Sequence, residues 1–440
     1  MVGVISRFFT SIVNKYLPDP LVFAILLTII TFILGITITP HSAMDMVGMW
    51  GDGFWNLLAF AMQMSLVLVT GHALASSGPV KKGMTALASV AKTPAQGVML
   101  VGFCSAVACV INWGFGLVVG AMFAREVARR IPKSDYRLLI ATAYMGFLSW
   151  HGGFSASVPL VAATPGNPME KMVGLIPISS TIFTGYNLFI TAGLIILVPL
   201  IARMMMPKEH EIVAIDPALL REDVSVAKEL GSDATWAERI EESRILAWVV
   251  GLLGIVYLGN YFAQKGFNLN VNTVNLMFLT AGILLHKTPM AYVRAISAAA
   301  KGTAGILIQF PFYAGIQIMM EHSGLGGIIT NWFVNVATAE TFPIMAFFSS
   351  ALINFAVPSG GGHWVVQGPF VMPAAQALGA DMGKAAMAIA YGEAWMNMAQ
   401  PFWALPALAI AGLGVRDIMG YCVTALLFSG VIFIIGLHFF

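Results

Sequence analysis

Apolar runs about as long as a bilayer is thick dominate this chain, and they constrain its fold more than any other feature. Each spanning helix needs roughly 20 mostly apolar residues. Such runs occupy residues 17–39, 54–77, 183–206, 244–263, 270–286, 303–321 and 418–440. Hydrophobic residues make up 58% of the chain and charged residues 10%, whereas a soluble domain is about 25% charged. Because backbone polar groups must be satisfied internally in lipid, the sequence predicts an all-α polytopic membrane protein.

Two further apolar segments are too long for one span and too short for two. They are 94–124 and 345–380, and polar, glycine-rich stretches break them at 112–116 and 354–363. Irregular backbone at membrane depth is tolerated only where it is buried in protein or lines a cavity. We therefore expect two re-entrant hairpins with these stretches at their tips.

Two more segments are interrupted once each. The segment 137–163 is interrupted around Trp150 to Gly153, and 384–412 around Asn397 to Pro401. Together with the uninterrupted runs, they predict about nine transmembrane helices in addition to the two hairpins. Broken helices of this kind supply backbone groups for substrates and ions in secondary transporters.

The placement of basic residues predicts the orientation. With the N-terminus and the hydrophilic linker 207–243 in the cytoplasm, 20 of the 23 lysines and arginines fall on the cytoplasmic side. The outside receives only Lys171, Lys265 and Lys384, which satisfies the positive-inside rule. We expect the N-terminus to be cytoplasmic and the C-terminus to lie on the outer side of the membrane.

The two halves of the chain resemble each other. Ile111-Asn112 matches Ile353-Asn354 at an offset of 242, and Ala143-Tyr144 matches Ala390-Tyr391 at 247. Because an odd number of predicted spans precedes the second copy, the copies are expected to be inverted, as in many secondary transporters. The predicted organisation is 1–206 as the first inverted repeat, 207–243 as the cytoplasmic linker, 244–263 as a connecting transmembrane helix and 264–440 as the second inverted repeat.

The hairpin tips are candidates for binding an anion. Half-helix N-termini offer free N–H groups and a positive dipole end, and glycines let the backbone approach a ligand closely. Alternatively, the glycines only turn the chain and the asparagines only cap helices. The candidate substrate-binding residues are Asn112, Gly114, Gly116, Ser155, Ser157, Asn354, Ser359, Gly360, Gly361, Gly362 and His363.

Polar residues in the second broken helix are candidates for a coupling ion. Glu393 is ionisable at membrane depth, where such residues are functional suspects, although it could also sit nearer the interface. Na⁺ or H⁺ would be the coupling ion, and no other cofactor or metal is expected. The candidates for this role are Asn112, Asn354, Glu393, Asn397 and Gln400. His151 is placed like His363, but a structural role is the simpler interpretation for it.

Other classes of function fit poorly. No basic run indicates nucleic-acid binding, and the three cysteines form neither a disulfide framework nor a CxxC pair. The stretch from His151 to Ser157 lacks the final glycine of a G-x-S-x-G nucleophile elbow, so an intramembrane hydrolase is not expected. A passive channel would not need repeated broken helices. We expect a transporter and not an enzyme.

Several long motifs resemble the bacterial short-chain fatty acid transporter family. They are WGDGFWNLLAF (50–60), GHALASSGPV (71–80), NWGFGLVVGAMFAREVARR (112–130), LVAATPGNP (160–168), NFAVPSGGGHWVVQGPFV (354–371) and GEAWMNMAQPFWALPALAIAG (392–412). The resemblance implies secondary active uptake of short carboxylates such as butyrate or acetoacetate. The NFAVPSGGG tip is similar to a motif of the larger ion-transporter superfamily, which implies a homodimer with an elevator motion. A di- or tricarboxylate carrier of that superfamily is the alternative.

Overall fold

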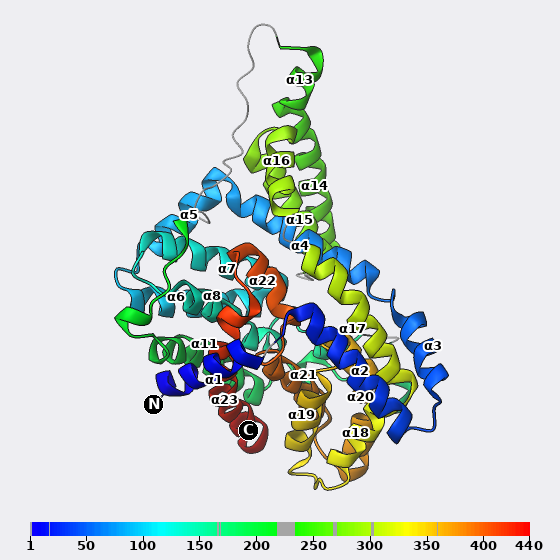
Figure 1. Ribbon diagram of the computed structural model, residues 1–440. Coiled ribbons are helices and arrows are strands. Elements are labelled where there is room, and N and C mark those ends of the chain that lie inside the picture. The colour runs from blue at the N-terminus through cyan, green and yellow to red at the C-terminus, as the bar shows by residue number, and fades with distance from the viewer. Residues whose placement is uncertain are drawn as a thin grey trace.

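The computed structural model describes residues 2–16, 18–164, 167, 169–217, 234–266, 271–300, 303–358 and 360–440. Within these ranges the chain forms helices joined by short connections, and no strand occurs (Figure 1). The predicted all-α class is therefore confirmed. Ser359, one of the predicted binding residues, lies outside the described residues.

Five described helical segments are long and apolar enough to cross a membrane. They are α2 (Pro20–Ile38), α6 (Pro94–Ile111), α11 (Gly185–Met204), the segment Trp236–Lys265 and α23 (Val415–Phe439). A sixth is added if α16 (Pro289–Ala300) and α17 (Ala304–His322), bent by 55°, count as one span. The total of nine spans stays a prediction.

The chain reverses at Asn112, where the first hairpin is predicted. Helices α6 and α7 (Trp113–Arg130) run antiparallel, since Gly97 packs on Val127 and Gly120 packs on Ser105. Nearer the turn, a Cβ on Gly116 would lie 2.6 Å from the backbone nitrogen of Cys109. The small residues of this pair therefore let the two helices approach closely.

A second reversal follows α19 (Phe342–Ile353). Helix α20 (Gly360–Leu378) turns back so that His363 Nε2 lies 3.2 Å from the carbonyl oxygen of Ser350. One turn further on, the Gln367 amide donates to the Ser349 hydroxyl. The paired contacts place the first turns of α20 beside the last turn of α19.

Both predicted helix breaks are present. The first lies in α8 (Tyr136–Met145), η1 (Gly146–Gly152) and α9 (Ser157–Ala162). The second lies in α21 (Met382–Met396), η5 (Phe402–Ala404) and α22 (Leu405–Ala411). In each half the broken segment packs on the first helix of the preceding reversal, η1 on α6 and α21 on α19.

Several short helices were not predicted. The N-terminal α1 (Val2–Tyr16) packs along α23, and it ends before the first span, which starts at Pro20 and not at 17. The other unpredicted helices include α3 (Ala43–Gly53), α5 (Gly78–Ala88) and α18 (Leu325–Val334). Shorter pieces are α10 (Glu170–Val173) and η2 (Ile178–Ser180). The linker 207–243 was expected to be partly helical, and its described residues form η3 (Glu209–Glu211) and α13 (Trp236–Glu241).

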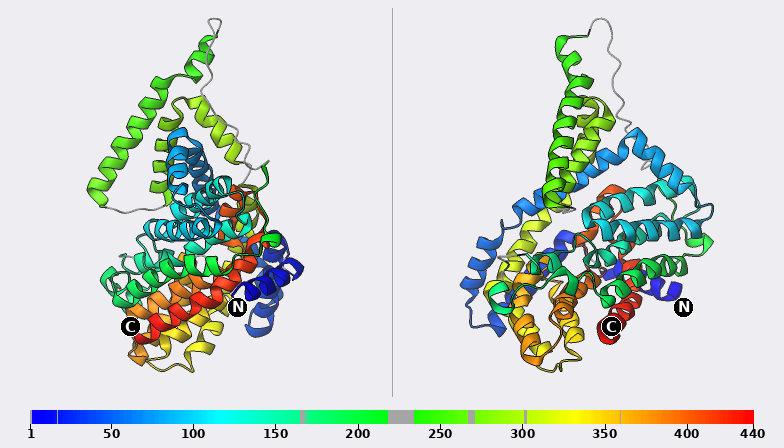
Figure 2. Two further views of the ribbon diagram at one scale, coloured as in Figure 1. Left: turned by 90° about the vertical axis from the view of Figure 1, so that its left-hand side faces the viewer. Right: turned by 180° about the vertical axis from the view of Figure 1, so that it is seen from behind.

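An arm projects from the main body in all three views (Figure 1, Figure 2). It consists of α14 (Arg244–Lys265), α15 (Val271–His286) and α16, with α4 (Leu58–Ser76) packed against α15 and α16. The helix pairs around the two reversals and the two breaks lie in the main body. The predicted candidate residues that the structure describes therefore lie outside the arm.

Candidate functional site

A buried carboxylate on α21 lies at the centre of the site. The side chain of Glu393 is 0% exposed, and its Oε2 lies 2.9 Å from Nε2 of His151, which is also 0% exposed. Its Oε1 accepts a hydrogen bond from Nδ2 of Asn397 at 3.0 Å. A charge at membrane depth requires such partners, and here they come from η1 and from the end of α21.

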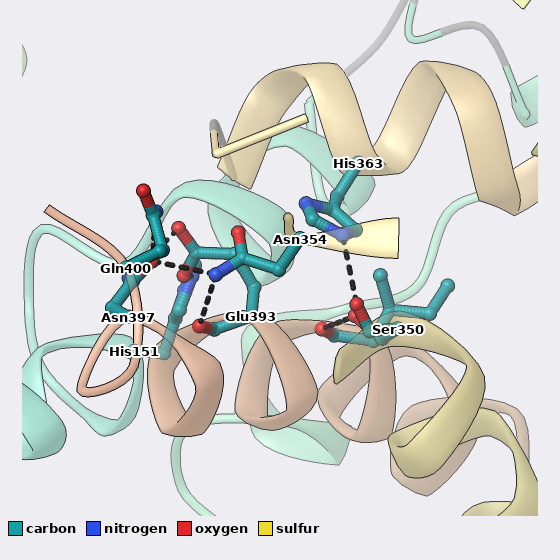
Figure 3. Close-up of polar contacts among 8 residues, drawn as sticks. His151, Ser350, Asn354, His363, Glu393, Asn397 and Gln400 are labelled. Carbon is teal, nitrogen blue, oxygen red and sulfur yellow. Dashed lines mark hydrogen bonds and ion pairs between the residues drawn. The ribbon is translucent and has the colours of Figure 1, made fainter. Parts of the chain in front are cut away.

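Three amides extend this arrangement. Asn397 Oδ1 accepts from Nδ2 of Asn354 at 2.8 Å and from Nε2 of Gln400 at 3.1 Å. The Asn354 amide also reaches the carbonyl oxygen of Glu393 at 3.2 Å. We call His151, Asn354, Glu393, Asn397 and Gln400 the central network. Figure 3 shows these side chains gathered together, with His363 reaching Ser350 separately.

The central network contains no lysine or arginine. Among the described residues, its side chains form hydrogen bonds with one another and with backbone groups, including the amide of Phe402. Asn397 is further held through its carbonyl oxygen, which accepts from the Tyr144 hydroxyl at 2.8 Å. A bound anion here would be held by neutral donors or by a proton.

Two atoms of the network have no hydrogen-bond partner among the described residues. They are Nδ1 of His151 and Oδ1 of Asn354, and both are buried. Buried polar atoms are nearly always paired, so these two atoms are available to a water molecule, an ion or a ligand. One atom is a potential donor and the other an acceptor.

The tip of the first reversal is largely satisfied by its own neighbours. Asn112 Oδ1 accepts from the amide of Phe115 at 3.0 Å and so caps α7. Ser155 Oγ accepts from the next free amide, that of Trp113, at 2.9 Å. Gly114 and Gly116 face Val67 and Cys109. The structure does not link Asn112 to the central network by a hydrogen bond.

The tip of the second reversal lies against the first broken helix. A Cβ on Gly360 would fall 2.8 Å from Cβ of Ser157 and 3.0 Å from Cε1 of His151. The same position on Gly361 has no atom within 4 Å, and on Gly362 it lies 3.1 Å from Nε2 of Gln317. The predicted residues Ser157 and Gly360 are thus brought next to His151.

His363 and His151 occupy different places. His363 is fully buried and holds α20 to α19 through the Ser350 carbonyl. His151 pairs with Glu393, which sequence reasoning did not foresee. In the sequence, His151 lies in a glycine-flanked break at membrane depth, as the candidate binding residues do, and this position could have indicated a role in the site.

Aromatic rings surround the network on one side. The ring of Trp150 lies 3.7 Å from the His151 ring, and Trp113 contacts Trp403 at 5.1 Å between centroids. Phe147 stacks on Trp150 at 5.1 Å. These rings form an apolar wall beside the two breaks. Among the described residues, no three His, Cys, Asp or Glu side chains converge as a possible metal site.

The apolar helices and the buried network between two broken helices define a helical membrane transporter. The family model described as "Short chain fatty acid transporter" matches residues 1–440. The chain therefore belongs to the short-chain fatty acid transporter family, and it is a transporter and not an enzyme.

Two relatives extend over the full chain. One from Escherichia coli K12 is 71% identical over 440 residues and one from Haemophilus influenzae Rd is 64% identical over 446, each covering 100% of both chains. Both are named "Putative short-chain fatty acid transporter". The crystal structure of the Alcanivorax borkumensis YdaH transporter aligns at TM-score 0.43 and 18% identity, over 95% of this chain and 98% of that one. That likeness is too distant to bear on this chain.

Proposed function

We propose that the protein is a secondary active transporter of short-chain fatty acid anions, such as butyrate or acetoacetate, across the bacterial inner membrane. The observation that carries the proposal is the central network, a buried polar site with unpaired Nδ1 and Oδ1 atoms and no lysine or arginine. Membership of the family supports the substrate class. Transport is driven by a coupled cation, H⁺ or Na⁺.

The substrate carboxylate binds where the second tip meets the first broken helix. Gly360, Gly361 and Gly362 form the first turn of α20, and a helix N-terminus favours an anion. Ser157 lies opposite Gly360. Ser155, Ser359 and His363 complete the proposed substrate set, together with Asn112, Gly114, Gly116 and Asn354. The apolar tail is expected to contact the aromatic wall around Trp150.

The coupling-ion role falls to the central network. Asn354, Glu393, Asn397 and Gln400 are mutually bonded there, which supports a shared function. The sequence also predicts Asn112 as a ligand of the coupling ion. Its side chain accepts a hydrogen bond from the Phe115 amide, so it caps α7 as well. Glu393 is the ionisable member from α21.

Two inverted repeats and an elevator motion belong to the proposal. In each half, a broken helix packs on the first helix of a chain reversal. This supports repeats at 1–206 and 264–440 around the linker 207–243 and the helix 244–263. The arm of α4, α14, α15 and α16 would be the static part. The main body, which holds the network, would move.

A homodimer is proposed through the outer face of α14. Gly251 and Gly254 bring this helix close to Leu284 and Thr280 of α15, whereas Trp248 is 64% exposed on the outside. Oxidative crosslinking of Trp248→Cys in a cysteine-free background tests the contact. Failure of every position along α14 to crosslink would indicate that the helix faces lipid.

The proposed orientation is supported by the residues at the two ends of α23. Arg7, Lys15 and Arg137 line one recess with Tyr421, near the start of the helix. Lys384 lines another with His438, at its other end. This grouping supports a cytoplasmic N-terminus and a periplasmic C-terminus.

Uptake of labelled butyrate into proteoliposomes preloaded with unlabelled butyrate tests the function. We expect protein-dependent exchange above that of protein-free liposomes, and accumulation when the driving cation gradient is imposed alone. The two gradients, pH and Na⁺, are imposed separately. Exchange no faster than in protein-free liposomes would refute the proposal.

A further inference from the structure

The pairing of His151 with Glu393 has consequences beyond holding the fold together. Each side chain is 0% exposed, and they come from η1 and α21, 242 residues apart in the chain. All their hydrogen bonds are within the described residues: Nε2 to Oε2, and Oε1 to Asn397. Nδ1 of His151 has no partner there.

The number of protons on this pair determines whether Nδ1 of His151 is a hydrogen-bond donor or an acceptor. With Glu393 ionised and His151 neutral, the ring proton sits on Nε2 and is donated to Oε2, so Nδ1 is a bare acceptor and the pair carries one negative charge. One added proton makes the pair neutral. Whether that proton lies on the carboxyl or on the ring, Nδ1 then carries a hydrogen.

The imidazole ring of His151 borders the proposed carboxylate position. Its Cε1, which lies between Nδ1 and Nε2 in the ring, is an atom that a Cβ on Gly360 would approach to 3.0 Å. A Cβ on Gly361, the next residue of the tip, would have no atom within 4 Å. A protonated Nδ1 can therefore donate to an anion at this tip, whereas a bare Nδ1 on a negatively charged pair repels it.

Other titratable groups around the pair do not provide a compensating positive charge. The Tyr144 hydroxyl donates to the Asn397 carbonyl oxygen and that of Tyr391 to Oδ1 of Asn187. His363 contacts the Ser350 carbonyl, and the buried thiols are Cys109 on α6 and Cys422 on α23. Neither His151 nor Glu393 contacts a lysine or arginine in the described structure.

We propose that the His151–Glu393 pair binds one proton with each substrate anion, which makes the protein an electroneutral proton–monocarboxylate symporter. The inference rests on the proposed function and names its coupling ion. The proton comes from water on the side to which the site opens. It stays on the pair while Nδ1–H donates to the carboxylate, and it leaves with the anion on the other side.

Calorimetric titration of the purified full-length protein with butyrate, in buffers of different ionisation enthalpy, counts the protons taken up. We expect about one per butyrate, and an affinity that falls about tenfold per pH unit once the free pair has lost its proton, because the two ligands are linked. Replacing Na⁺ by choline should leave the affinity unchanged. Working in detergent avoids passive diffusion of butyric acid through lipid.

The variant Glu393→Gln separates the proton from the anion. A glutamine amide can donate to Nε2 and leave the hydrogen on Nδ1, so we expect butyrate to bind without proton uptake and without pH dependence. The matched control is Glu126→Gln, which removes another buried carboxylate. Glu126 lies near the end of α7 and forms hydrogen bonds with Thr85 and Arg129. This control should still take up about one proton per butyrate, as expected from the same linkage.

The outcomes distinguish this inference from the proposed function. Butyrate binding with no proton uptake and no pH dependence in the wild type would overturn the symport inference while leaving the transporter intact. A wild-type protein that neither binds nor exchanges butyrate would overturn the proposed function, and the inference with it. The wild-type proton count is decisive even if Glu393→Gln does not fold.

Discussion

Glycines at the two chain reversals have different surroundings, which separates packing from binding at the scale of single residues. A Cβ on Gly116 would lie 2.3 Å from Sγ and 2.6 Å from the backbone nitrogen of Cys109. A helix backbone atom packed between two helices cannot move aside without a large energetic cost. A Cβ on Gly361 meets nothing within 4 Å.

We therefore predict that Gly116→Ala lowers stability by about 1–3 kcal/mol through overpacking, while Gly361→Ala unfolds at the wild-type temperature. Thermal unfolding followed by size-exclusion chromatography measures both. Gly361→Leu should fold as well, yet bind acetate, propionate and butyrate more weakly by a similar factor, because they share the carboxylate. Wild-type stability of Gly116→Ala would show that the close approach of α6 and α7 is wrong.

Sequence reasoning identified members of the site but not their partners. Asn354, Glu393 and Asn397 stand out because polar groups are costly at membrane depth. Their convergence with His151 depends on tertiary packing across 242 residues, which no local pattern encodes. Asn112 fits both a ligand and a helix cap by residue type, and only the position of the Phe115 amide shows the cap.

At the scale of elements, breaks were easier to predict than short helices. Short polar, glycine-rich stretches inside long apolar runs predict the positions of both chain reversals and both helix breaks. A search for apolar runs misses α1, whose 15 residues mix Arg7 and Lys15 with apolar side chains. The start of the first span is likewise set locally, since Asp19 accepts from the Leu21 amide at 2.9 Å and Pro20 begins α2.

The position of α1 should depend on pH through Glu211. The amide of Lys208 donates to this carboxylate at 3.1 Å, and together with Arg7 at 3.6 Å it holds the pKa of Glu211 below 4.5. The Arg7 contact is the part of this lowering that involves α1; it stabilises the docked helix above the ordinary pKa, and that contribution is lost as the pH falls through the lowered value. We expect a nitroxide at Ser11 to be immobile at pH 7 and more mobile well below pH 4.5.

The variant Glu211→Gln should show the higher mobility already at pH 7, because it lacks the charge that Arg7 contacts. Glu209→Gln, two residues away, serves as the control and should behave as wild type. Equal mobility of the Ser11 nitroxide in wild type and Glu211→Gln at neutral pH would mean that α1 is held by its apolar packing on α23 alone.

At the scale of the whole molecule, the charge distribution predicts the orientation. Single cysteines at Glu209 and Phe440, in a background without Cys104, Cys109 and Cys422, should react with impermeant reagents from opposite sides of the membrane. The 20-to-3 division of basic residues gives the expected sides, with position 209 in the cytoplasm. Reaction of both positions from the same side would contradict the predicted topology.

The proposal that the protein carries monocarboxylates is tested by comparing the binding of monocarboxylates with that of a dicarboxylate. The central network holds no lysine or arginine, so a second buried carboxylate would lack a partner, while each added methylene contributes roughly 0.8 kcal/mol, about fourfold in affinity. The measurement is displacement of labelled butyrate from purified protein by acetate, propionate, butyrate, hexanoate and succinate. We expect displacement to strengthen from acetate to butyrate and to weaken once the fatty acid tail overfills the site. Succinate should displace little labelled butyrate. Succinate competing as well as butyrate would contradict it and favour a dicarboxylate carrier.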